Sequence, residues 1–250
     1  MTRTLPFDGQ LPAPAGRANL NACWALWAQG RRRKRAAGQV APSLPAPVAV
    51  WELDSIPFLD SSGRGNNLTN NNSVGVTAGK FGNAALFTLA SQNYLSAVCN
   101  ADTNCGGTQD WTVCGWASLS TVGAQSVIWS QYDMTAASVV QFYYDPGGGG
   151  CGLYITSNTL AYQYWNGMGG ARTANVPFFW AVTRSGTTYL VRINGNSTSN
   201  TGFAVLNGGT CQFYLGTNGG CWAGMWLDRV RKFNVALTDA QLTQLMNEVV

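Results

Sequence analysis

The sequence contains no histidine, and its only glutamates are Glu52 and Glu248. Histidine is the usual general base and a member of the Ser-His-Asp triad, so its absence excludes those catalytic arrangements. No two cysteines have the C-x-x-C spacing, which a zinc site without histidine would need. The composition therefore argues against the common hydrolytic triads and against a structural zinc ion.

Long apolar runs are also missing. No stretch approaches the roughly 20 apolar residues that span a membrane. The N-terminal residues lack the continuous apolar core of a secretory signal, and their cationic cluster follows the apolar part instead of preceding it. We expect no transmembrane segment and no signal peptide.

Charge is scarce, at 10% of the residues, and it is unevenly distributed. Residues 1–47 hold seven Arg and Lys against one acid, whereas residues 48–250 hold eight against ten. The basic character thus belongs to the first segment alone. We predict a basic arm over 1–47 and one domain over 48–250, which is long enough to bury a full core.

The seven cysteines permit two local bridges, Cys99–Cys105 and Cys211–Cys221. The odd number and the missing signal peptide favour free thiols instead. The sequence leaves the two alternatives open.

The arm carries an amphipathic pattern followed by a run of charge. Apolar residues at 20, 23, 24 and 27 have the spacing of one helical face, and a run of five cations follows them. Prolines at 42, 45 and 47 predict a stiff spacer. The predicted docking residues are Leu20, Trp24, Trp27, Arg31, Arg32, Arg33, Lys34 and Arg35.

Four interpretations of the arm compete. It is a solvated disordered segment, a weak nucleic-acid patch without sequence preference, a membrane-surface helix, or a docking arm whose tryptophan face is buried in a partner. We favour the docking arm, and we expect no specific nucleic-acid ligand.

From residue 48 onward the sequence pattern changes to short aromatic and β-branched runs separated by Gly, Asn, Ser and Thr. This pattern is typical of an all-β sandwich. "NVALTDAQLTQLMNEV" then predicts one short terminal helix, in which Thr238 and Gln241 form a capping box. The predicted strands cover 111–119, 126–133, 139–145, 151–157, 160–165, 178–185, 187–196 and 211–217.

An ordered series of segments resembles the concanavalin A-like, laminin G-like jelly-roll domains over about residues 48–248. The resemblance implies a two-sheet antiparallel jelly-roll sandwich with a short C-terminal helix, preceded here by the N-terminal arm. The segments are "VWELDSIPFLDSSGRGNNLT", "AGKFGNAALF", "WTVCGWASL", "FFWAVTRSGTTYLVRINGN" and "YLGTNGGCWAGMWLDRVRKFNVALTDAQLTQL".

The same fold hosts endoglucanases, which use paired carboxylates. Strand alternation would place Glu52 and Asp54 on one face, and the glucanase pattern resembles Glu-x-Asp-x-Glu. The third acid would fall at position 56, which is Ile56 here. We therefore expect a protein that is not an enzyme.

Aromatic and amide residues near strand ends predict a sugar-binding surface, because sugar C–H faces pack on rings while hydroxyls pair with polar side chains. The alternative is that these rings fill the core. The predicted ligand-binding residues are Trp129, Tyr132, Asp133, Tyr162, Tyr164, Trp165 and Asn166.

The resemblance also implies a structural calcium ion near the first and last strands, held by Asp60 and Asp228. Calcium needs six to eight oxygens, which a sequence cannot display. No other cofactor is expected.

Together these observations predict a non-catalytic, lectin-like surface domain displayed by the docking arm. The missing signal and the single adhesive-looking domain favour a virion component, such as a phage head decoration, fibre or tail appendage, that binds host or matrix glycans. A purely structural virion protein is the alternative, and an endoglucanase-like hydrolase is less favoured. We also expect a homo-oligomer, located on a virion surface or otherwise outside the cell.

Overall fold

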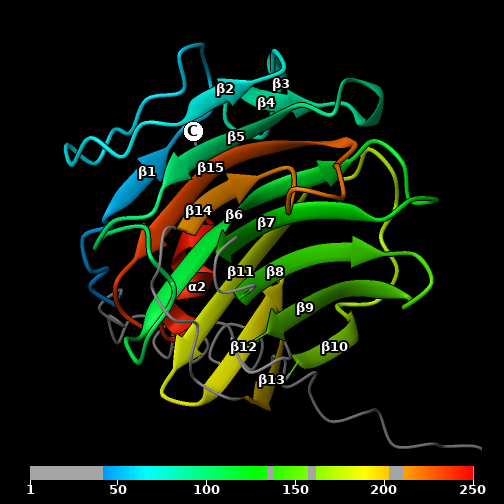
Figure 1. Cartoon of the computed structure of the whole chain (residues 1–250). Helices are drawn as coiled ribbons and strands as arrows, with labels where there is room; N and C mark the ends of the chain where they lie inside the picture. The colour runs from blue at the N-terminus through cyan, green and yellow to red at the C-terminus, as the bar shows by residue number, and fades with distance from the viewer. Residues whose placement is uncertain (1–41, 134–137, 157–161, 203–210, 250) are drawn as a thin grey trace, which may run out of the picture. The chain divides into compact units, whose positions relative to one another are not determined.

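The computed structural model describes residues 42–133, 138–156, 162–202 and 211–249. They form two antiparallel sheets packed face to face, with β7 to β10 in one layer and β11 to β13 in the other (Figure 1). The predicted all-β jelly-roll sandwich is confirmed. Sheet A has the order β13 (Asn196–Thr201), β12 (Thr188–Ile193), β11 (Phe178–Ser185), β6 (Trp111–Leu119), β15 (Met225–Phe233), β4 (Asn83–Phe87), β3 (Gly75–Ala78), and β1 (Ala49–Trp51) pairs with β15. Sheet B has the order β10 (Tyr162–Met168), β9 (Gly150–Thr156), β8 (Ser138–Asp145), β7 (Ser126–Asp133), β14 (Cys211–Leu215), β5 (Tyr94–Val98), β2 (Thr69–Asn71).

The core between the sheets is rich in tryptophan. Trp51, Trp111, Trp129 and Trp180 are fully buried, and Trp111 meets Trp129 edge to face at 5.5 Å between ring centroids. Burial of each such ring contributes at least about 1.5–3 kcal/mol through the apolar area removed from water. Apolar alternation along the strands thus specifies the inner faces of both sheets.

Helix α2 (Asp239–Met246) covers an apolar part of the outer face of sheet A. Phe179, Ala181 and Phe233 point outward from the sheet and pack against Leu242 and Leu245 of the helix. The predicted capping box is present, since the Thr238 hydroxyl accepts from the Gln241 N–H and the Gln241 side chain accepts from the Thr238 N–H. No helix within the described residues has the length and apolar character needed to cross a membrane.

The proline segment differs from its predicted role as a spacer. The compact unit begins at Pro42, because Leu44 packs on the α2 cluster and the Ser43 carbonyl accepts from Gln241 at 2.7 Å. A proline-rich chain needs no hydrogen-bonded ladder, so it can lie extended along the surface of the sandwich. The domain therefore starts six residues earlier than 48.

The cysteine predictions are corrected as well. Cys99, next to β5, is bonded to Cys211 in β14, and neither of the two local bridges forms. The two strands are neighbours in sheet B although they lie far apart in the sequence. Cys105, Cys114, Cys151 and Cys221 are free, and burial raises the pKa of the first three thiols to about 12, so these stay protonated.

Candidate functional site

The outward face of sheet B is defined by strand alternation. In β8, Val140 and Phe142 enter the core, so Gln141 and Tyr143 point outward. Residues opposite one another in an antiparallel pair share a face. Gln141 lies opposite Tyr154 of β9, and Tyr154 lies opposite Tyr164 of β10. One outward row thus crosses three strands.

Tyrosine dominates this face. Of the nine tyrosines in the chain, only Tyr144 and Tyr189 belong to the core between the sheets. The other seven, which we call the tyrosine face, are Tyr94, Tyr132, Tyr143, Tyr154, Tyr162, Tyr164 and Tyr214.

The loop between β14 and β15, residues 216–224, divides the tyrosine face into two parts. The Ser130 hydroxyl donates to the Thr217 carbonyl at 2.6 Å, and the Asn218 amide donates to Gln141 at 2.7 Å. This loop covers the middle of the sheet, so Ser130 and Gln141 are buried although they point outward. The rings over β9 and β10 stay accessible, with Tyr162 70% and Tyr164 49% exposed.

Beside these rings lies a polar cluster in which Asn166 is the centre. Tyr143 donates its hydroxyl to the Asn166 Oδ1 at 2.8 Å. The Asn166 Nδ2 donates to Asp145 at 3.1 Å, and Tyr164 donates to the same carboxylate oxygen at 3.0 Å. The rings of Tyr143 and Tyr164 stack at 6.0 Å between centroids. The cluster holds a carboxylate and an amide in fixed positions next to exposed rings.

Burial raises the pKa of the Tyr143 hydroxyl, and the interaction with the Tyr164 hydroxyl and the charge of Asp145 act in the same direction. The hydroxyl therefore stays protonated and acts as a donor toward Asn166. This fixes the amide with its Nδ2 directed toward Asp145.

Gly152 of β9 makes the contact between β8 and β10 possible. A Cβ at this position would lie 2.4 Å from the Asn166 Oδ1 and 2.5 Å from the Tyr143 Cζ and hydroxyl oxygen. The bare backbone lets Tyr143 reach across β9 to Asn166. A register shift between Trp165 and Met168 then ends the regular pairing of β10 at this point.

Gly152→Ala is expected to lower the free energy of unfolding by about 1–3 kcal/mol, because the new methyl group overlaps two ordered side chains. Urea denaturation measures this loss. Gly75→Ala in β3 is the matched control, since a Cβ there meets no atom within 4 Å. Equal stability of the two variants would contradict the packing described for Gly152.

The predicted ligand residues separate into two groups. Tyr162, Tyr164 and Asn166 come together on the tyrosine face, and Tyr132 lies outward on the same sheet, opposite Val139. Asp133 ends β7 one residue later.

The two tryptophans do not belong to this surface. Trp129 is fully buried against Phe213, and Trp165 faces the core, where its ring lies 6.0 Å from Tyr189. The prediction for both was wrong because strand alternation sends Trp165 to the face opposite Tyr164, and Trp129 pairs with the inward Phe142.

Three residues of the site were not predicted: Tyr143, Asp145 and Tyr154. All three lie in segments that were recognised as strands. The alternation in "QFYYD" separates an inward Phe142 and Tyr144 from an outward Tyr143 and Asp145, and this signal was available. The sequence did not show which strands become neighbours in the sheet.

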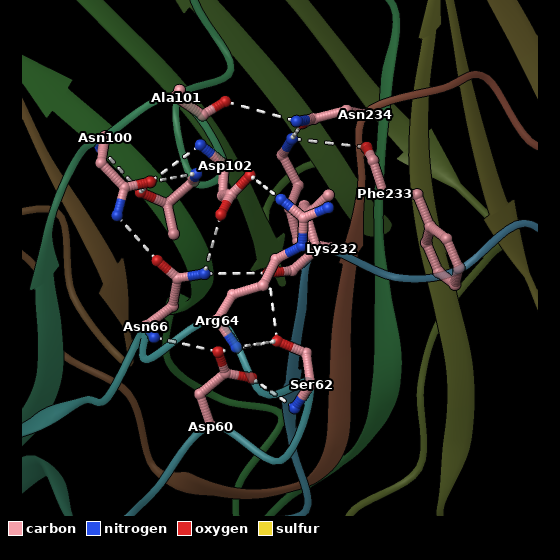
Figure 2. Close-up of polar contacts among 12 residues, drawn as sticks. Asp60, Ser62, Arg64, Asn66, Asn100, Ala101, Asp102, Lys232, Phe233 and Asn234 are labelled. Carbon is pink, nitrogen blue, oxygen red and sulfur yellow. Dashed lines mark hydrogen bonds and ion pairs between the residues drawn. The ribbon is translucent and has the colours of Figure 1, made fainter.

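The calcium prediction rested partly on Asp60. Figure 2 shows this carboxylate with Ser62 and Asn66 in the loop that follows β1. It accepts from the N–H groups of Val50, Ser62 and Asn66 at 2.9 Å each and from the Ser62 hydroxyl at 2.8 Å. Burial opposes its ionisation, but these bonds hold the pKa of Asp60 below its ordinary value. Four donors match the four lone-pair sites of a carboxylate, so Asp60 organises the loop and does not fit a metal.

Asp228 has a separate role in β15. One carboxylate oxygen accepts from the N–H groups of Lys80 and Phe81 at 2.7 and 2.8 Å, while the other is buried without a partner. Within the described residues, no three acidic or cysteine side chains gather as metal ligands would. Calcium stays a prediction, and a shared site of Asp60 and Asp228 is not supported by the hydrogen bonds around Asp60.

The carboxylates considered for glycoside hydrolysis are engaged in other contacts. Glu52 pairs with the Arg229 guanidinium at 3.0 Å, and Arg229 also contacts Glu248 at 3.4 Å. Asp54 accepts from the Asn83 N–H at 3.1 Å. The predicted docking residues, from Leu20 to Arg35, lie outside the described residues.

Comparison with known proteins gives no matching family model and no matching curated protein. Solved structures do match. Domain 4 of AbnA, an extracellular arabinanase of Geobacillus stearothermophilus determined with arabinotriose, has a TM-score of 0.66 at 19% identity, covering 80% of this chain and 98% of that one. The binding domain of paraclostridial mosquitocidal protein 1 has a TM-score of 0.66 at 14% identity and covers 81% of this chain.

The botulinum neurotoxin serotype D binding domain, determined with N-acetylneuraminic acid, has a TM-score of 0.62 at 13% identity and covers 80% of this chain. The chain spans about half of the two toxin domains, 52% and 50% respectively. At these identities the likeness establishes the fold, a two-sheet antiparallel β-sandwich.

Proposed function

We propose that this domain binds glycans through the tyrosine face and does not hydrolyse them. The observation that carries the proposal is the segregation of tyrosine. Seven of nine tyrosines point outward from one sheet, whereas on the opposite sheet α2 covers an apolar part of the outer face. Rings that served only to stabilise the fold would be expected inside the core.

Sugar recognition requires hydrogen-bonding groups for the hydroxyls in addition to aromatic rings, and the polar cluster supplies them. Stacked rings accept the C–H faces of a sugar, and a carboxylate next to an amide accepts and donates hydrogen bonds to its hydroxyls. Tyr164 supplies both elements, because its ring is exposed and its hydroxyl bonds to Asp145. The arabinotriose and N-acetylneuraminic acid bound by two structures of the same fold support glycan binding by analogy only.

A binding role is favoured over hydrolysis by the state of the carboxylates. Retaining glycosidases need two acids about 5–5.5 Å apart, one of which donates a proton. Here Glu52 is paired with a guanidinium, and the position of a third acid is held by Ile56. The Arg229 guanidinium occupies a carboxylate oxygen of Glu52, so that oxygen is engaged in the ion pair.

Display on a virion surface through the arm is a further part of the proposal, and it rests on the sequence of residues 1–47 alone. The alternative, a purely structural virion protein, would leave the tyrosine face without a ligand. Glycan binding therefore decides between the two.

A glycan array probed with the full-length protein tests the proposal. Tyr154→Ala and Tyr162→Ala are each expected to weaken binding about tenfold, as loss of an aromatic contact residue does. Tyr162→Phe keeps the ring and is expected to retain most of the affinity. Leu59→Ala removes an exposed apolar side chain outside the sheets and serves as the control. A blank array, or binding that none of the tyrosine variants changes, would reject the tyrosine face as a lectin site.

A further inference from the structure

Sheet B differs from the rest of the sandwich in charge. None of its seven strands contains an arginine or a lysine. The strands of sheet A, by contrast, carry Arg184, Arg192, Arg229, Arg231 and Lys232. The absence extends to most connecting segments, because residues 65–79, 81–171 and 193–228 have no cationic side chain. The exception beside this face is Arg172, after β10, whose guanidinium donates to the Gly169 and Gly170 carbonyls.

The charge that sheet B does carry is negative. Asp145 lies in the polar cluster, beside the exposed ring of Tyr164. Its carboxylate accepts from Tyr164, from Asn166 and from the Gly147 N–H. A carboxylate offers about four lone-pair sites, so acceptor capacity remains for one hydroxyl. A sugar hydroxyl can use that site, whereas a sugar carboxylate would be repelled.

Acidic sugars need the opposite environment. The carboxylate of a sialic or uronic acid loses water on binding. A cation or free N–H groups must compensate for the free energy of this desolvation. The N–H groups of the interior strands of sheet B are committed to their antiparallel neighbours. The strand residues of this face therefore offer an anion only the neutral donors of tyrosine and amide side chains.

The rings also suggest an extended ligand. Tyr132 lies in β7, Tyr154 in β9 and Tyr164 in β10, so the rings extend over three strand spacings, or about 14 Å. A single sugar ring can contact the neighbouring rings of Tyr154 and Tyr164, whose centroids lie 6.4 Å apart, but it cannot reach Tyr132 as well. A chain lying across the strands contacts several.

Building on the proposed glycan-binding function, we infer that the tyrosine face selects uncharged, hydroxyl-rich oligosaccharides and rejects glycans that carry sialic or uronic acid. The rejection arises from the lack of any strand cation and from Asp145, and the preference for chains arises from the spread of the rings.

Matched glycan pairs test this inference on the full-length protein. The neutral members are arabinotriose and N-acetyllactosamine, and the acidic members are trigalacturonate and sialyl-N-acetyllactosamine. Only the binding that Tyr154→Ala removes is scored, which excludes contributions from the basic residues 1–41. The neutral member of each pair is expected to bind about tenfold tighter than its acidic partner, because like charges oppose the latter. Arabinotriose is expected to bind more tightly than arabinose.

A gain-of-function variant provides a second test of the inference. Val139 lies opposite Tyr132 on the outward side of β8, so Val139→Arg places a guanidinium on this face. The variant is expected to bind sialyl-N-acetyllactosamine more tightly than wild type does, and Val139→Gln is the uncharged control.

Tyr154-dependent binding in which the acidic members equal or exceed the neutral ones would overturn the inference while leaving the glycan-binding proposal intact. Absence of Tyr154-dependent binding to every probe would overturn both.

Discussion

Replacing both Cys99 and Cys211 with alanine is expected to lower the free energy of unfolding by about 3–5 kcal/mol. The bond joins residues 112 positions apart, and opening a loop of that length restores about 4–5 kcal/mol of chain entropy to the unfolded state. Urea denaturation of the wild type and the double variant, each with and without a reducing agent, measures the difference.

The two halves of this experiment control each other. Reduction should destabilise the wild type by about as much as the double substitution does, and it should leave the variant unchanged. Cys221→Ala removes a free, half-buried thiol and is expected to have a much smaller effect. If the reducing agent left the free energy of unfolding of the wild type unchanged, the result would contradict the Cys99–Cys211 bond.

This bond illustrates what the sequence could not supply. Its two cysteines belong to neighbouring strands, β5 and β14, which are brought together only by the order of sheet B. The spacing of cysteines along the chain indicates only which cysteines are close in the sequence. It therefore suggested bridges within short local segments. Pairings between distant strands require the topology first.

Strand positions, in contrast, were predictable from local chemistry. The segments 111–119, 126–133 and 178–185 agree with β6, β7 and β11 residue for residue. The first of these runs is followed by Ser120, and the third ends at Ser185 before Gly186, which marks their C-terminal boundaries. The capping box likewise placed the start of α2.

The site was predictable in part, because two kinds of information define it. Alternation within one strand groups Tyr162, Tyr164 and Asn166 and separates Trp165 from them, so applying it strictly would have removed that tryptophan. Recruiting Tyr143 requires knowing that β8 and β10 flank β9 and that Gly152 leaves space between them. That information depends on register across three strands.

Asp228→Ala is expected to destabilise the fold by about 3–5 kcal/mol. The carboxylate of this buried residue accepts from the N–H groups of Lys80 and Phe81, and so ties the turn before β4 to β15. Truncation leaves two backbone donors without their acceptor, each at a cost of about 1–3 kcal/mol. The surroundings are tight, since a Cβ on Gly79 would lie 2.7 Å from the Asp228 Oδ2.

Asp228→Asn separates the hydrogen bonds from the charge. Its amide oxygen can accept from both N–H groups, so most of the stability is expected to remain, and the loss should be clearly smaller than for alanine. Thermal and urea denaturation of the two variants at neutral pH measure the order. If asparagine were as destabilising as alanine, the ionised carboxylate and not its acceptor function would be the stabilising element.

The pH dependence provides the independent check. Burial raises the pKa of Asp228 above its ordinary value, with the N–H groups of Phe81 and Lys80 acting in the other direction. In this range the unfolded chain releases the proton first, so it binds fewer protons than the folded protein does. The contribution of Asp228 to stability is therefore full below the ordinary carboxyl pKa and is lost as the pH rises through the raised value. Asp228→Asn should remove this decline, whereas the contribution of Asp60, whose pKa is lowered, has the opposite sign and should persist in the variant.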